Sequence, residues 1–183
     1  MANVKSSVNE IIKDTFYGKR VINLSEEIIF KALIEANNNT KAHFAISPQV
    51  SFSQFIRCEN KVNWHKYKTF SVDFLVWDRD SRIPLLVVEY HGGGHYGGDE
   101  YNTFVDKNDL IKFTILEKAG IEFVIIDDEE ISLKTTMEKN KKKGALWHKF
   151  CDIFEELQKE LPQIRQKYKE TEERNRAKNK KTK

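Results

Sequence analysis

Two apolar segments separated by a short polar turn constrain the fold of this chain more than any other feature. Residues 71–77 (SVDFLVW) and 84–91 (PLLVVEYH) each have the length and the branched, aromatic composition of a buried β-strand. Residues 78–81 (DRDS) between them are typical of a turn. Each apolar run contains one carboxylate, Asp73 in the first and Glu89 in the second. We therefore expect two consecutive strands that carry acidic side chains.

The residues before this strand pair predict a helix and a further strand. Residues 23–26 (NLSE) match a helix N-cap with glutamate at position N3, and an apolar stripe follows until the asparagines at 37–39, where the helix is expected to stop. Residues 43–52 are expected to form a strand that is interrupted near Pro48. Residues 53–69 are expected to form a polar loop.

The residues after the pair predict an alternation of helix and strand. A glycine-rich loop at 92–98 comes first, Gly120 is placed just past the end of a helix, and Pro162 breaks or restarts another. The expected elements are a helix over about 103–119, a strand over 121–126 and a helix over about 146–161. The order helix, strand, strand, strand, helix, strand implies an α/β layer structure around a mixed sheet.

Composition limits the classes of protein to which the chain can belong. Its 183 residues fit one domain with a tail, and 39% hydrophobic residues are enough for a core. The longest apolar stretches have the length of a buried strand, so we expect no membrane span, and the N-terminal residues lack a secretion signal. Cys58 and Cys151 match neither a disulfide framework nor a zinc pair, so we expect a reducing, cytoplasmic compartment.

The positive charge is concentrated at the C-terminus. Residues 165–183 contain nine Lys or Arg and three Glu, a net charge of +6, whereas the whole chain has a net charge of +3. The body of the protein is therefore slightly acidic. Such a tail can bind phosphates, or it can be the solvated end of a helix.

The two strand carboxylates predict a metal site. Side chains alternate along a strand, so Glu89 and His91 point to the same face. A carboxylate among apolar neighbours is costly unless it is paired, and two carboxylates on adjacent strands repel each other unless a cation lies between them. Oxygen ligands suit Mg²⁺ or Mn²⁺ better than Zn²⁺. The alternative is that Asp73 and Glu89 form ordinary ion pairs with lysine or arginine.

The segment HGGGH (91–95) has two other interpretations. It resembles the oxyanion-hole loop of hormone-sensitive-lipase-type esterases, but no Gly-x-Ser-x-Gly motif follows, and the chain is too short for that fold. His91 and His95 have the spacing of zinc ligands on a helix, but the three glycines between them disfavour a helix. We therefore expect the glycines to let another backbone, such as a nucleic-acid strand, approach closely.

Two further segments carry residues suited to nucleic-acid chemistry. Asp109 and Lys112 share a face of the expected helix, either as a surface ion pair or with Lys112 reaching toward metal-held acids. The segment KVNWHKYK (61–68) interleaves cations with flat rings, which is typical of nucleic-acid binding. The alternative is a polar loop with its rings folded onto the core. The candidate binding residues are Lys61, Trp64, His65, Lys66 and Lys68.

Four segments together resemble the PD-(D/E)XK nuclease superfamily, in the branch of the very-short-patch-repair-like endonucleases. They are LSEEIIF (24–30), SVDFLVW (71–77), LLVVEYHGGGH (85–95) and NDLIKFTILEKAGIEFVII (108–126). The resemblance implies a restriction-endonuclease-like αβββαβ core with a mixed central sheet over residues 23–127. Residues 1–22 would add an N-terminal helix, and residues 128–183 C-terminal helices and the basic tail.

The resemblance also implies roles for single residues. The metal ligands that it implies are Glu26, Asp73, Glu89 and, through its carbonyl oxygen, Tyr90. His95 would match the histidine that closes the loop, and Asp109 and Lys112 would match a helix pair. His91 stands where the superfamily has a lysine, and Asn108 where an arginine is expected. We expect His91 to act as the general base, because imidazole titrates near neutral pH; Lys112 from the helix is the alternative.

Together, these expectations predict a divalent-metal-dependent nuclease. We expect an endodeoxyribonuclease that uses Mg²⁺ or Mn²⁺, with DNA favoured over RNA as its substrate. The expected catalytic residues are Asp73, Glu89, His91 and Lys112. The alternative is a catalytically degenerate module of the same fold that binds nucleic acid or a partner protein. We expect no membrane partner. The sequence leaves open whether the protein forms a homodimer or binds a partner protein.

Overall fold

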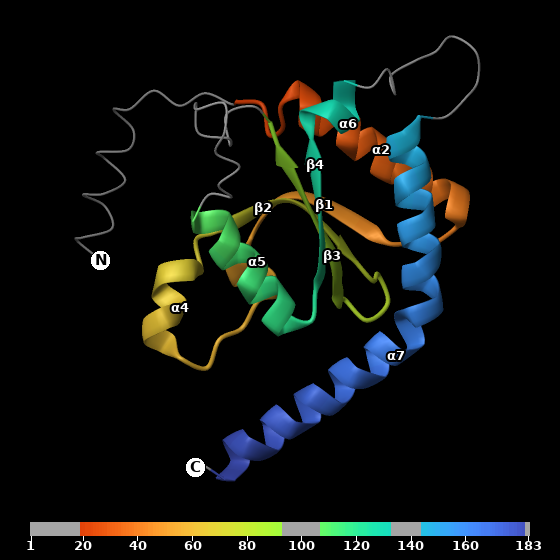
Figure 1. Cartoon of the computed structure of the whole chain (residues 1–183). Helices are drawn as coiled ribbons and strands as arrows, with labels where there is room; N and C mark the ends of the chain where they lie inside the picture. The colour runs from red at the N-terminus through yellow and green to blue at the C-terminus, as the bar shows by residue number, and fades with distance from the viewer. Residues whose placement is uncertain (1–18, 93–106, 133–143, 182–183) are drawn as a thin grey trace, which may run out of the picture.

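A four-stranded sheet forms the centre of the computed structural model, which describes residues 19–92, 107–132 and 144–181 (Figure 1). The strands are Ala45–Ser51 (β1), Ser71–Trp77 (β2), Pro84–His91 (β3) and Glu122–Asp127 (β4), and they lie in this order across the sheet. Strands β1, β2 and β3 pair antiparallel, and β4 pairs parallel with β3. The predicted α/β class with a mixed sheet is therefore confirmed.

Helices cover the two faces of the sheet (Figure 1). Their apolar side chains form two cores with those of the strands. Alternation along β3 explains the division, because Val88 faces one core and its neighbour Val87 the other. The core around Val88 includes residues of helices α2 (Leu24–Thr40) and α7 (Ala145–Lys181). The core around Val87 includes residues of α3 (Phe52–Phe55) and α5 (Lys107–Ala119). The remaining described helices are α4 (Lys61–Tyr67) and α6 (Asp128–Ser132).

The start of α2 is the one that the sequence predicts, but its end is not. The Asn23 side chain accepts from the Glu26 N–H, and the Glu26 side chain accepts from the Asn23 N–H, both at 2.9 Å. The expected stop at the asparagines is wrong, because the helix continues to Thr40. The Asn37 side chain is buried instead, where it donates to and accepts from the Phe44 backbone at 3.0 Å. A buried amide with both bonds satisfied does not compete with the helix.

Two further expectations are wrong. The polar loop over 53–69 contains most of α3 and all of α4. Pro162 lies inside α7 and does not interrupt it. A proline inside a helix loses one hydrogen bond and crowds the carbonyl four residues before it, but Leu161 and Ile164 on either side of Pro162 pack against the apolar core and offset this cost. Gly120 ends α5 with a φ of 69°, as predicted.

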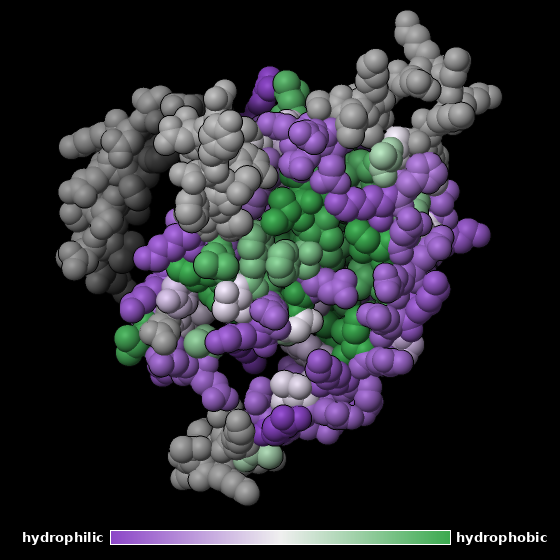
Figure 2. All heavy atoms as spheres, viewed as in Figure 1, coloured by the Kyte–Doolittle hydropathy of each residue, from purple (hydrophilic) through white to green (hydrophobic). Residues whose placement is uncertain are grey.

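The surface is unevenly polar. Apolar side chains gather at the centre of the viewed face, in the region of β4, whereas polar side chains cover α7 (Figure 2). Phe123 of β4 is 38% exposed and stacks on Phe113 of α5 with 4.4 Å between the ring centroids. None of the helices in the described ranges is long and apolar enough to cross a membrane.

Candidate functional site

The carboxyl end of β3 brings the two strand acids together. Phe74 and Val88 are the last paired residues of β2 and β3 at this end, so Asp73 and Glu89 are the next neighbours across the two strands. Here the Asp73 Oδ2 accepts a hydrogen bond from the backbone N–H of Tyr90 at 2.8 Å. The two carboxylates are close enough for the charge of Asp73 to affect the protonation of Glu89.

Glu89 is a buried acid, with only 3% of its surface exposed. Burial raises the pKa of Glu89 to about 7; the Lys112 ammonium opposes this change, and the negative charge of Asp73 adds to it. Without a cation, Glu89 is therefore partly protonated near neutral pH. A cation between Asp73 and Glu89 would favour the ionised form of both.

Lys112 of α5 reaches this pair of acids. Its Nζ lies 2.9 Å from Glu89 Oε1 and 3.4 Å from Asp109 Oδ1. Burial acts to lower the pKa of Lys112, but Glu89 and Asp109 outweigh it and raise that pKa, so the ammonium stays protonated. The predicted pair of Asp109 and Lys112 is therefore not a surface ion pair, because α5 turns both side chains toward the sheet.

His91 lies beside Asp109, the second acid that Lys112 contacts. It is 6% exposed, and its Nε2 is 3.6 Å from Asp109 Oδ2. Its ring stacks on Phe113 with 6.0 Å between the centroids. His91 therefore lies on the same face as Glu89, as predicted, but it is covered by α5, and Asp109 connects it to Lys112.

Glu26 joins the group from a different element. It lies at the N-terminus of α2, where its Oε2 accepts from the Asn23 N–H and its Oε1 lies 3.5 Å from Gln49 Nε2. Partial burial and the charge of Asp73 raise the pKa of Glu26 against the effect of the Asn23 bond. Gln49 also lies 3.2 Å from Asp73 Oδ1. Gln49 was not predicted, because an isolated glutamine beside Pro48 carries no sequence pattern.

Tyr90 occupies the next position on β3 and points to the other face. Its hydroxyl donates to Asp128 of α6, and its ring lies over Gly92, where an added Cβ would be 2.7 Å from the Tyr90 Oη. A larger residue at the start of the predicted glycine-rich loop would therefore force the Tyr90 ring to move. His95 and the rest of that loop lie outside the described residues.

The chemistry of the donors fits a hard divalent cation, although the side chains do not form a closed metal cage. Within the described ranges, no three His, Cys, Asp or Glu side chains come together as a ready-made metal site. Glu89 is turned toward Lys112, and Asp73 toward Tyr90 and Gln49. The residues available to hold Mg²⁺ or Mn²⁺ are the three carboxylates Glu26, Asp73 and Glu89, whose oxygen atoms suit these ions.

The candidate nucleic-acid segment is helix α4 followed by Lys68. Trp64 packs against the core around Val87, and Tyr67 lies 5.8 Å from the Phe70 ring, so two of its rings fold back. The cationic and polar side chains of this segment face outward: Lys61, His65 and Lys66 are exposed, and Lys68 is half-buried. The segment therefore presents its charges, and not its tryptophan, to a partner.

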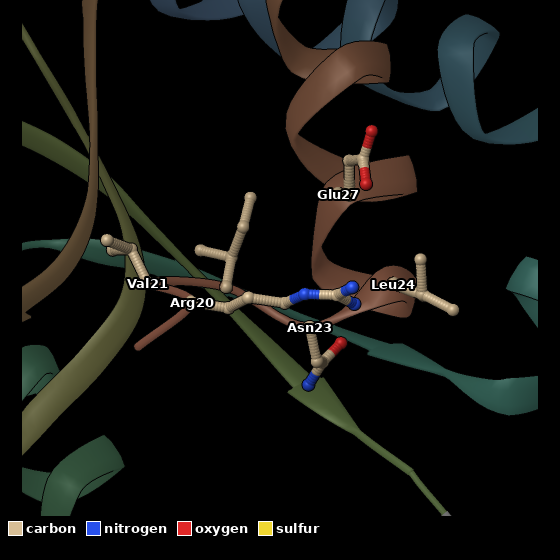
Figure 3. Close-up of a pocket in the computed structure, with 6 residues that line it drawn as sticks. Arg20, Val21, Asn23, Leu24 and Glu27 are labelled. Atoms are coloured by element: carbon tan, nitrogen blue, oxygen red, sulfur yellow. The ribbon is translucent and has the colours of Figure 1, made fainter. Parts of the chain in front are cut away.

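A surface hollow of about 360 Å³ lies at the start of α2. Figure 3 shows the Arg20 side chain extending across this hollow, with Asn23 and Leu24 beside it and Glu27 one turn further along the helix. The hollow is next to the helix cap, and none of the strand acids lines it.

Comparison with families of known proteins gives a match that includes the site. A family model described as "Protein of unknown function (DUF2726)" matches residues 18–142, which is more than half of the chain and includes every described residue of the site. No curated protein and no solved structure matches the chain significantly.

Proposed function

The chain belongs to the DUF2726 family, and we propose that it is a divalent-metal-dependent nuclease with a restriction-endonuclease-like core. The observation that carries the proposal is the meeting of Asp73 and Glu89 at one end of the sheet, with Glu26 linked to them through Gln49. The order of α2, β1, β2, β3, α5 and β4 supports the same proposal.

The carboxylates and Lys112 divide the chemistry between them. Asp73, Glu89 and Glu26 would hold the ion. Bound Mg²⁺ or Mn²⁺ would lower the pKa of the attacking water and neutralise charge on the scissile phosphate. Lys112 is protonated, so it would stabilise negative charge on the phosphate or donate a proton to the leaving oxygen, and it is not available as a base in this state.

The substrate that we propose is DNA. The exposed cations of α4, Lys61 and Lys66, would contact phosphates, and the basic residues after Arg165 would add further contacts. These contacts carry no sequence information, so they predict binding that depends strongly on salt and weakly on sequence.

A degenerate module that binds nucleic acid or a protein partner is the second candidate. It is favoured by the position of Lys112, because an ammonium 2.9 Å from Glu89 can satisfy the buried acid without any metal. The two candidates differ in whether a divalent cation binds the folded protein.

The test combines metal-linked melting with DNA nicking. We expect Mn²⁺ to raise the melting temperature of the wild type and to support plasmid nicking, because an ion that binds only the folded state stabilises it. Asp73→Asn and Glu89→Gln should abolish both effects and keep DNA affinity. Their metal-free melting temperatures should stay at or above that of the wild type, because each change removes a charge from a repelling pair.

The control is Glu155→Gln, which removes an exposed carboxylate from α7. It should melt and nick like the wild type. A wild type with neither Mn²⁺ response, together with Asp73 and Glu89 variants that melt well below it, would show that these acids are structural ion-pair partners. The degenerate module would then replace the nuclease.

A further inference from the structure

Gln49 links acids from two different elements. It lies opposite Asp73, because the paired residues on either side of it are Pro48 with Phe74 and Val50 with Val72. Its Nε2 lies 3.2 Å from Asp73 Oδ1 and 3.5 Å from Glu26 Oε1. Carboxylate oxygens only accept hydrogen bonds, so the amide must present its two N–H groups to the two acids. One neutral side chain thus lies between two negative charges.

The backbone of Gln49 is held in a conformation that favours glycine. Its φ is 52°, which is in the left-handed region, although the residue lies within strand β1. A residue with a Cβ is strained there, and glycine is not. Such strain persists where the surrounding structure imposes it, and it is concentrated at functional sites. Glutamine differs from glycine here by the amide that contacts the two acids.

We propose that Gln49 is a positioning residue: its amide holds Glu26 and Asp73 at a fixed spacing and so prepares them to bind a divalent cation. This inference rests on the proposed function. Without the amide, the two carboxylates repel each other and separate before a cation arrives. Each acid keeps a backbone partner that would hold it apart, Asn23 for Glu26 and Tyr90 for Asp73. Loss of a side chain that orients metal ligands typically lowers metal affinity about 10- to 100-fold.

The experiment compares two variants of Gln49 with one matched control. Gln49→Met removes the hydrogen-bond donor but keeps the length of the side chain and the backbone strain. Gln49→Gly removes the donor and relieves the backbone strain. The control is Lys41→Gly, because Lys41 has nearly the same φ of 54° and lies at the other end of α2, about 20 Å along the helix from Glu26. The melting temperature of each full-length protein is followed as Mn²⁺ is added, without nucleic acid.

We expect both Gln49 variants to need about 10- to 100-fold more Mn²⁺ than the wild type for the same rise in melting temperature. Lys41→Gly should respond like the wild type. If the melting temperatures of both Gln49 variants rise at the same Mn²⁺ concentration as that of the wild type, the inference about Gln49 is overturned and the proposed metal site stands. This holds even if the variants melt at a lower temperature than the wild type without Mn²⁺. If the wild type itself shows no response, the proposed metal site is overturned, and the inference falls with it.

Discussion

Glu89, Lys112, Asp109 and His91 form a continuous row of charged and polar side chains between β3 and α5. The successive distances are 2.9 Å from Glu89 to Lys112, 3.4 Å from Lys112 to Asp109, and 3.6 Å from Asp109 to His91. Lys112 therefore contacts the acid that we propose as a metal ligand, whereas the Nε2 of His91 lies beside Asp109. This arrangement reverses the roles that the sequence favoured for the two residues, so we propose Lys112 as the catalytic cation.

Substitutions of these two residues should separate their roles. Lys112→Met should lower the nicking rate by about 10²- to 10³-fold, because it removes a fixed positive charge from the reacting phosphate. His91→Gln should cost less than about tenfold. Lys112→Arg keeps the charge and controls for the loss of the Lys112 contacts to Glu89 and Asp109, and melting curves show that each variant is folded. An inactive His91→Gln together with an active Lys112→Met would restore His91 as the catalytic residue.

At the scale of elements, helix α7 is fixed to the sheet at the end opposite the acids. The Arg165 Nε lies 2.7 Å from Asp78 Oδ2, in the turn between β2 and β3. The part of β3 from Pro84 to Glu89 separates this turn from Glu89 by about 17 Å, at about 3.3 Å for each residue step. The C-terminal part of α7 extends away from the sheet (Figure 1). A duplex that contacts both the basic tail and the acids must therefore run along the whole sheet.

Deletion of residues 166–183 tests whether this helix end binds DNA. The deletion removes eight Lys or Arg and three Glu and leaves the ion pair between Arg165 and Asp78 in place. We expect the deletion to weaken DNA binding and to make it less dependent on salt. The slope of log K against log salt should become shallower by about 0.9 for each phosphate that the tail neutralises in the full-length protein. The nicking rate at saturating DNA should not change, because the tail lies far from the acids. An unchanged slope would remove the tail from the binding surface.

At the scale of the whole molecule, the buried Glu89 links the stability of the fold to pH. Its pKa is raised from 4.5 to about 7, chiefly by burial, so between these values the folded protein binds more protons than the unfolded chain. The stability from this group is fully present below pH 4.5 and is lost as the pH rises through 7. The loss is on the order of 3 kcal/mol.

Urea unfolding with a chelator present should show this loss as a fall in the unfolding free energy between pH 5 and pH 7.5. Glu89→Gln should flatten the fall, because the amide oxygen still accepts from Lys112 but does not ionise. Added Mn²⁺ should oppose the fall in the wild type, since the cation favours the ionised carboxylates. Equal pH profiles for wild type and Glu89→Gln would show that another group causes the dependence.

The sequence by itself determined the features that depend on local chemistry and periodicity. The capping box at Asn23, the glycine that ends α5, the strands around Asp73 and Glu89 and the mixed α/β class all follow from short-range patterns. The end of α2 and the continuity of α7 through Pro162 did not follow, because interactions with Phe44 and with the apolar core outweigh local propensity there.

Only the tertiary structure decided how the site is assembled. Glu26, Gln49, Asp73, Glu89 and Lys112 come from five different elements, and their distances depend on strand register and on the packing of α2 and α5 against the sheet. A pattern along the chain shows which face a residue occupies, but it does not show which side chain from another element lies opposite. That is why Lys112, although expected to be catalytic, was placed second to His91 as the general base, and why Gln49 was not predicted at all.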